Sequence, residues 1–443
     1  MKNILNQFTL VSISVFFIVT NAFGDVLSGG KKIRILGIGD PVFQVMQKIL
    51  PEMEKAAGGT IELDVRGFDP LRQQVLLNSK NKESDYDLIA VDLPQFGEYT
   101  PFLSDMSDYV DGSTMDPSDF YQVAWAGGIH DGGKILGIPL QPHPEIFAYR
   151  KDIFAKYGLA APKSTDDVIN AAKIIHENEE GMAGICWNAG RGTPLGQAFI
   201  MTQGAFGQAS IDLDRSGDGF TFATIADSNM RPMVDTPSGR ATAQYFLDLM
   251  NYSPDGILNM AWDERVRVFS QGGCGMTYIW SGRSAIYEND PDSKARGKVG
   301  YLPHPHGPGA YNMSTLGGWY LSIPKNIDPE RADLAWSVIE WLTSKDMLQE
   351  YTKHGNCVSP RPDVSQEPSV QKQCPVIGWV DAMAQFDLLA GWQRPPVPEI
   401  QGIVDTMGVE MHDMISGGKS LDDAIKTSQK KLERMMKKAG YSF

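Results

Sequence analysis

Two tryptophans of the sequence stand where a predicted strand ends or turns at glycine. Trp280 lies in YIWSGR and Trp319 in GGWY, directly after Gly318. An indole at such a place either stacks on the apolar face of a bound molecule or packs in the core, and the sequence leaves both alternatives open. Trp392, in GWQRPP, is a further candidate of the same kind.

Polar side chains that form hydrogen bonds in pairs occupy similar positions. Asp40 ends the first predicted strand, either as a ligand contact or as a helix cap. Asp92 and Gln95 follow a predicted buried strand over 87–91, and ligands of open α/β sheets bind at the carboxyl ends of strands. Three more candidates lie in a proline-rich stretch, where ligand contact and hinge bonding are equal alternatives: Gln141, His143 and Glu145.

Four arginines complete the candidate set. Arg191 lies between glycines in AGRGT, and Arg283 follows Trp280 closely. Arg361 in SPRPD and Arg394 are suited to clamping an acidic group with two parallel hydrogen bonds. A surface ion pair is the more common role of an arginine, and we expect it for most of these four.

Motifs for cofactor, metal or catalytic chemistry are incomplete. Gly37-Ile38-Gly39 imitates a dinucleotide loop, but Val42 replaces the third glycine. The 212–217 segment imitates a calcium loop, but Ala223 stands where a bidentate Glu is needed. His304 and His306 have no evident third metal ligand. We therefore expect no cofactor and no metal, although the sequence does not exclude the paired carboxylates of a glycoside hydrolase.

The elements that position these side chains read as alternating strands and helices. Strand patterns at 31–38, 61–65 and 87–91 alternate with helix patterns that begin at Pro41 and Leu71. This order predicts a doubly wound parallel sheet. Three later helices are expected after Ser164, after Asp328-Pro329 and from Leu421, each with an apolar stripe.

Composition and the N-terminus indicate an exported, acidic, globular protein. The formal net charge of −14 repels nucleic acids and anionic membrane surfaces, so neither is expected as a partner. Residues 1–24 combine Lys2, an apolar run and small residues before a cleavage point, as in a secretory signal peptide. In an oxidising compartment we expect a disulfide between Cys357 and Cys374. Cys186 and Cys274 are interpreted as buried thiols, with a second bridge as the alternative.

Five segments, in this order, resemble the maltose-binding-like solute-binding proteins of ABC sugar and polyol importers. They are YDLIAVD (86–92), KILGIPL with FAYRKDIFAKYGL (134–159), VFSQGGCGMTYIW (268–280), GGWYLSIPKN with the following helix (317–346), and PEIQGIVDTMG (398–408). The resemblance implies two α/β lobes that close on a ligand by hinge motion. It implies an N-terminal lobe of 25–140 plus 314–357 and a C-terminal lobe of 141–313 plus 358–443.

What the resemblance implies for function is a monomeric, non-catalytic carrier in the periplasm. It would capture a small sugar or polyol between the lobes and deliver it to an inner-membrane ABC permease. Two alternatives stay open: the same fold with an acidic or sulfonated sugar or a compatible solute, and an exported carbohydrate-active enzyme.

Overall fold

The computed structural model describes residues 25–443 except 218–219, 311 and 386. The predicted signal peptide, residues 1–24, lies outside the described residues. In the described part, no helix is both long and apolar enough to cross a membrane. Strands and helices alternate along the chain, and this confirms the α/β class.

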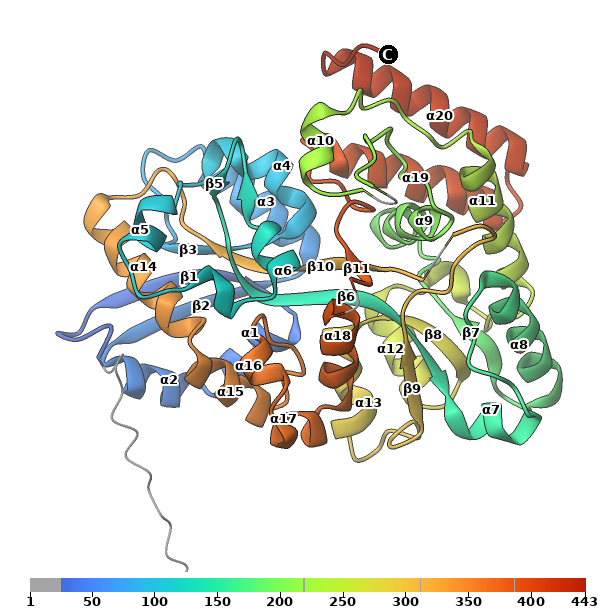
Figure 1. The fold of residues 1–443 in the computed structure, drawn as a ribbon, viewed down its shortest axis with the longest axis horizontal. Helices are drawn as coiled ribbons and strands as arrows, with labels where there is room; N and C mark the ends of the chain where they lie inside the picture. The colour runs from blue at the N-terminus through green and yellow to red at the C-terminus, as the bar shows by residue number, and fades with distance from the viewer. Residues whose placement is uncertain (1–24, 218–219, 311, 386) are drawn as a thin grey trace, which may run out of the picture.

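The first three strands form a parallel sheet (Figure 1), in which β1 lies between β2 and β3. Leu36 pairs with both neighbours, opposite Asp64 and Ile89. Gly58 ends the second helix in the left-handed conformation that favours glycine. The elements of this first region are β1 (Lys32–Ile38), α1 (Pro41–Lys48), α2 (Leu50–Ala57), β2 (Thr60–Arg66), α3 (Phe68–Asn78) and β3 (Leu88–Asp92).

The remaining strands extend the sheet into a second region. The strand order is β2-β1-β3-β10-β6-β8-β7, with β11 beside β10 and β9 beside β6. A separate hairpin joins β4 and β5. The bounds are β4 (Ile129–His130), β5 (Lys134–Ile135), β6 (Ile138–Arg150), β7 (Ala183–Cys186), β8 (Cys274–Trp280), β9 (Val299–Leu302), β10 (Ser314–Ser322) and β11 (Leu389–Ala390).

Helices cover the strands of both regions. Ser164 caps α8 through a capping box with Asp167, and Asp328 caps α14, as the sequence predicts. The helices beyond α3 are α4 (Phe96–Tyr99), α5 (Ser107–Asp111), α6 (Gln122–Ala126), α7 (Lys151–Tyr157), α8 (Thr165–Asn178), α9 (Thr193–Ala205), α10 (Ala223–Asp227), α11 (Pro237–Met250), α12 (Trp262–Ser270), α13 (Ala285–Asn289), α14 (Pro329–Leu342), α15 (Lys345–Lys353), α16 (Pro362–Ser365), α17 (Pro368–Gln373), α18 (Pro375–Gln385), α19 (Ile400–Ile415) and α20 (Leu421–Lys438).

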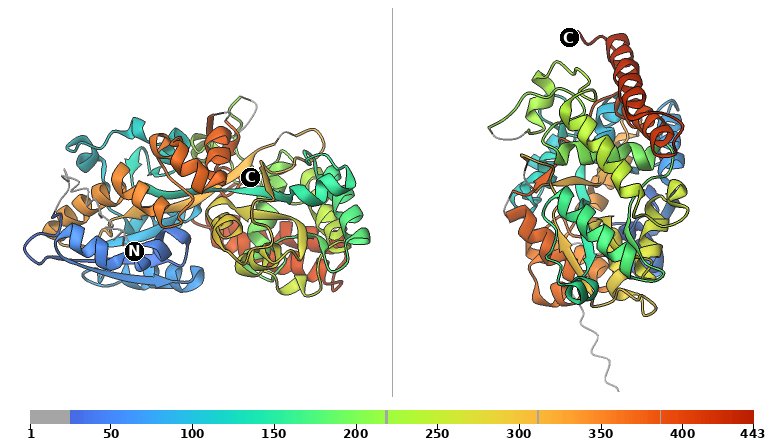
Figure 2. Two further views of the ribbon diagram at one scale, coloured as in Figure 1. Left: turned by 90° about the horizontal axis from the view of Figure 1, so that it is seen from below. Right: turned by 90° about the vertical axis from the view of Figure 1, so that its right-hand side faces the viewer.

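Two separate hydrophobic cores divide the molecule into two halves, which Figure 2 shows side by side. The first core contains buried side chains from 27–140 and 316–364, and the second contains buried side chains from 146–301, 357 and 370–436. Trp336 and Trp341 of α14 pack in the first core. Burial of these two apolar sets from water stabilises each half separately.

The long strand β6 crosses between the halves, as Figure 1 shows. Residues 138–144 pair with β10, whereas residues 145–149 pair with β8 in the second half. β10 makes a second crossing, because its Trp319–Ser322 end pairs with β3. The halves therefore share one sheet and are connected by backbone hydrogen bonds as well as by the chain itself.

Two disulfides link segments that are distant in sequence. Cys357 and Cys374 are bonded, with their Cα atoms 5.3 Å apart. The interpretation of Cys186 and Cys274 as thiols is wrong, because they form the second bridge. Each lies in a strand pattern, as predicted, but only the fold shows that β7 and β8 are neighbours.

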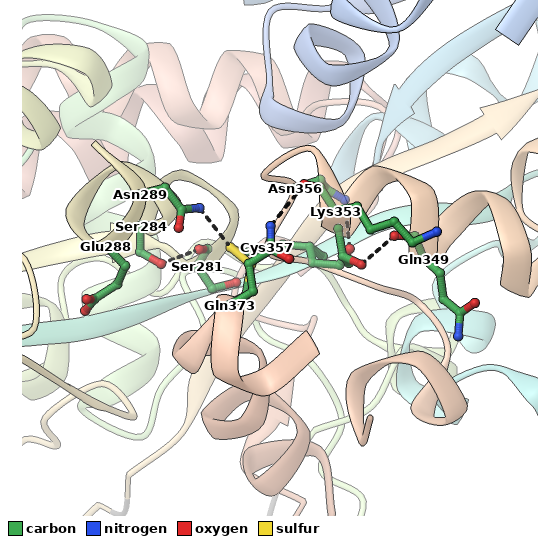
Figure 3. The surroundings of a disulfide bond; sticks show 12 residues. Ser281, Ser284, Glu288, Asn289, Gln349, Lys353, Asn356, Cys357 and Gln373 are labelled. Atoms are coloured by element: carbon green, nitrogen blue, oxygen red, sulfur yellow. Dashed lines mark hydrogen bonds between the residues drawn. A yellow bond between two sulfur atoms is a disulfide. The ribbon is translucent and has the colours of Figure 1, made fainter. Parts of the chain in front are cut away.

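The Cys357–Cys374 bridge lies where the chain passes between the halves for a third time (Figure 3). Cys357 follows α15, which packs on the first core, and Cys374 follows α17. The Asn289 side chain, from α13, donates a hydrogen bond to the sulfur of Cys357 over 3.8 Å. The bridge therefore fixes α17 to the crossing segment beside α13.

We expect the double variant Cys357→Ala/Cys374→Ala to lose about 3 kcal/mol of unfolding free energy, because the bridge closes a loop of 17 residues. Urea unfolding of the oxidised proteins measures this loss. Each single variant serves as a control and is expected to lose a similar amount, since either one breaks the same bond. A double variant as stable as the parent protein would contradict the expectation.

Candidate functional site

A cavity of about 390 Å³ lies between the two halves. Its wall combines residues that follow strands of the first half with residues of the second half and of the crossing strands. Seven of the fourteen predicted ligand-binding residues line it: Asp40, Asp92, His143, Trp280, Arg283, Trp319 and Arg394.

Asp40 joins the two halves across this cavity. One carboxylate oxygen accepts a hydrogen bond from the Arg283 guanidinium over 2.6 Å, and the other accepts one from the indole N–H of Trp319. Asp40 occupies the N-cap position of α1, as the helix-cap alternative has it, but its side chain makes no capping bond to the helix. Burial opposes ionisation, but Arg283 and these hydrogen bonds outweigh it and hold the pKa of Asp40 below its ordinary value.

Asp92 makes a second ion pair between the halves, with Arg394. The guanidinium of Arg394 lies over the ring of Trp280, with its carbon 5.1 Å from the ring centre. A side chain at Gly317 would collide with both Arg394 and Trp280, the nearest atoms being 2.6 and 2.7 Å from its Cβ. Glycine at 317 is therefore needed for this stack to form.

His143 sits between these two ion pairs in its neutral form. Gln141 and His143 are hydrogen-bonded through the amide nitrogen and Nδ1, 2.9 Å apart, and the other amide atom of Gln141 accepts from the backbone N–H of Val42 over 2.7 Å. Burial lowers the pKa of His143 to about 4, and the charges of Asp40 and Asp92 offset only part of this effect. Because the amide nitrogen of Gln141 donates to Nδ1, the neutral imidazole carries its proton on Nε2 and can donate a hydrogen bond there.

The position of Trp319 depends on an irregularity between the crossing strands. The pairing of β10 with β6 shifts register between Trp319 and Tyr320, as in a β-bulge. Gly318 has a φ of 132° and lies against β6, so that a side chain there would approach the carbonyl oxygen of Gln141 to 2.3 Å. Gly318 thus lets the strands approach closely, and it supports the site through the backbone.

Aromatic rings that the sequence analysis did not select complete one wall. Phe68, at the start of α3, lies 6.2 Å from the ring centre of Trp262 and 6.2 Å from that of Trp319. Trp262 begins α12. Phe68 comes three residues after the predicted strand that ends at Val65, so the same strand-end criterion that selected Asp40 identifies it. Arg66, Gln197 and Asp263 also line the cavity.

The other predicted residues lie elsewhere. Glu145 is buried beneath the site, where it accepts hydrogen bonds from Arg265 over 2.9 Å and pairs with His304 over 3.2 Å. Gln95 is buried beside the first core, and Gln141 and Gly318 act behind the cavity wall.

Three predicted ligand-binding residues contact other side chains away from the cavity. Arg191 pairs with Asp413 on the exposed surface, and Arg361 pairs with Asp119. Trp392 packs against Phe220, with ring centres 4.7 Å apart. None of the three lines the cavity.

The cavity carries balanced charge. Arg66 pairs with Asp64, Arg283 with Asp40 and Asp263, and Arg394 with Asp92. Each lining guanidinium is thus neutralised by at least one carboxylate. Within the described part of the chain, no group of His, Cys, Asp and Glu is arranged to hold a metal ion.

Comparison with known proteins identifies relatives over almost the whole chain. A family model described as bacterial extracellular solute-binding protein matches residues 40–349. A probable amino-acid ABC transporter periplasmic-binding protein of Sinorhizobium fredii is 25% identical and covers 93% of this chain and 91% of its own. The mannitol-binding protein of Pseudomonas aeruginosa is 22% identical, over 84% of this chain and 85% of its own.

Solved structures confirm the expected fold. An ABC transporter solute-binding protein of Agrobacterium radiobacter, in complex with ribitol, superposes with a TM-score of 0.83 at 23% identity, over 92% of this chain and 99% of its own. One from Agrobacterium vitis, with bound D-mannitol, gives 0.79 at 24% identity, over 93% of this chain and all of its own.

The neutral state of His143 predicts a pH-dependent stability. The pKa of His143 is about 4 in the folded protein, against about 6.5 in an unfolded chain, so the unfolded state binds more protons between these values. The unfolding free energy therefore rises with pH from about 4 to about 6.5, by roughly 3 kcal/mol for this residue.

Urea unfolding at several pH values measures this rise, and His143→Asn is expected to reduce it. His130, which does not line the cavity, also has its pKa lowered by burial to about 4. His130→Asn is the matched control, and it should reduce the rise similarly while leaving ligand binding unchanged. An unaltered pH profile in His143→Asn would contradict the neutral assignment.

Proposed function

The chain belongs to the bacterial extracellular solute-binding proteins, the solute-binding components of ABC transporters, and we propose that it captures a neutral sugar or polyol between its halves. The observation that carries this proposal is the neutralised cavity. In each ion pair a carboxylate, which accepts hydrogen bonds, lies beside a guanidinium, which donates them. Neighbouring hydroxyls of a sugar or polyol both donate and accept, so they can bind to such a pair.

The aromatic wall supports the same ligand class. Trp262, Trp280 and Trp319 line the cavity together with Phe68, and flat rings cover the C–H faces of sugars and polyols. A ligand without hydroxyls would leave the buried polar groups of Asp40, Asp92 and His143 without full hydrogen bonding, which costs affinity. Relatives with bound ribitol and D-mannitol agree with this class.

The alternative ligand for the same site is an acidic or sulfonated sugar or a compatible solute. Arg394 is the predicted clamp that reaches the cavity. The carboxylate of Asp92 already compensates the charge of Arg394, so the guanidinium attracts an anionic ligand only weakly. This alternative therefore ranks second.

The proposal includes no bond chemistry. A glycosidase acid needs a carboxyl group with a raised pKa, whereas the pKa of Asp40 is lowered. We propose that the mature protein works in the periplasm as a monomer, after removal of residues 1–24. There it delivers the ligand to an inner-membrane ABC permease.

Isothermal titration of the purified protein with a panel of pentitols, hexitols, hexoses and sugar acids tests the function. Binding of at least one neutral polyhydroxy compound at micromolar concentration supports it. Exclusive binding of sugar acids would replace it by the alternative class.

Replacing Trp280 by Leu is expected to weaken polyol binding at least tenfold, because the stacking face and the support of Arg394 are lost. Trp392→Leu is the matched control, since that ring is equally buried but lies outside the cavity. Titration of both variants checks the prediction. Equal affinities would remove Trp280 from the site.

The variant Asp92→Asn leaves Arg394 without its carboxylate. We expect its affinity for an aldonate to rise relative to that for the matching alditol, by at least tenfold in the ratio of dissociation constants. Asp413→Asn, which removes the partner of the surface residue Arg191, is the control and should leave the ratio unchanged. A ratio that stays constant in Asp92→Asn would show that charge balance does not set the ligand class.

A further inference from the structure

A second, larger hollow adjoins the cavity. It measures about 700 Å³ and is lined by α1, α12, α13 and the segment after α15. Hydrogen-bonding side chains line it, among them Gln44, Lys48, Arg267 and Asn289. We call this hollow the outer groove. It offers a second unit of a ligand the same kinds of polar contact that the cavity offers the first.

The cavity and the outer groove share one wall. Gly39, Asp263 and Arg283 line both spaces. The side chain of Arg283 lies between Asp40 and Asp263 and is hydrogen-bonded to both. Asp263 is at the rim, with 86% of its side chain exposed, whereas the Arg283 side chain is only 21% exposed.

The wall combines two side chains, those of Arg283 and Asp263, with the backbone of Gly39. Arg283 belongs to the short turn Ser281–Ser284 that follows β8, and its guanidinium reaches across to the first half. Gly39, on the opposite side, adds no side chain to the partition. Of the two side chains, that of Arg283 is the one that reaches from the second half to Asp40 in the first.

We propose that Arg283 is a specificity-determining residue that limits the ligand to a single sugar or polyol unit. This rests on the proposed function. With Arg283 in place, the ligand space is the cavity of about 390 Å³, close to the lower end of the roughly 300–1,000 Å³ that small-molecule sites span. Without it, a second unit extends into the outer groove between α1 and α12.

The test uses isothermal titration to compare two ligands. One is the hexitol mannitol, and the other is a glucosyl-mannitol, which is the same hexitol extended by one glucosyl unit. The parent protein is expected to bind the hexitol at least 100-fold more tightly. In Arg283→Ala the ratio of the dissociation constant of glucosyl-mannitol to that of mannitol should fall at least tenfold. The longer ligand gains space, while the shorter one loses a contact. Arg267→Ala, which changes the groove but not the partition, should leave hexitol affinity and the parent preference in place.

Arg283→Ala leaves Asp40 buried without its cation, which can prevent folding. The double variant Asp40→Asn/Arg283→Ala removes both charges, and Asp40→Asn alone is its matched control. The ratio should fall in the double variant relative to Asp40→Asn. Thermal unfolding checks that each protein is folded.

The outcomes separate the two proposals. A parent protein that binds the hexitol, with a ratio that Arg283→Ala and the double variant leave unchanged, overturns the role of Arg283 alone. The same holds if the parent binds both ligands equally. A parent that binds no neutral polyhydroxy compound from the wider panel overturns the proposed function, and the role of Arg283 with it.

Discussion

Two ion pairs that cross from one half of the molecule to the other, Asp40 with Arg283 and Asp92 with Arg394, determine the character of the site. Removing a charge from water is costly, and a buried pair is tolerated only where geometry and further hydrogen bonds are good. Trp319 supplies such a bond to Asp40. The same contacts hold the halves together and balance the charge of the cavity.

The ion pairs meet because the crossing strands hold the halves in one orientation. β6 pairs with β10 over its first half and with β8 over its second half, and the close approach at Gly318 lets Trp319 reach the cavity. The disulfide between Cys357 and Cys374 fixes the third crossing. A few strand residues and one bridge thus fix how the two halves are placed relative to each other.

Strand-end reasoning brought some of its candidates to the cavity but not all, since Gln95, which follows the same strand as Asp92, does not line it. Asp40 and Asp92 follow apolar strands and line the cavity, as predicted from their position. It was less informative for arginines: Arg394 reaches the cavity, whereas Arg191 lies on the surface with Asp413. Local sequence does not separate the two arginines, because the carboxylates that decide their roles, Asp92 and Asp413, are far away in the chain.

The sequence by itself determined the alternation of strands and helices, the helix caps and the resemblance to a family, because these depend on periodicity and on neighbours within a few residues. Tertiary structure alone decided that Cys186 bonds to Cys274, that Phe68 and Trp262 share a wall, and that Arg283 divides two spaces. Each of these depends on which distant strands and helices become neighbours, and no short stretch of residues contains that information.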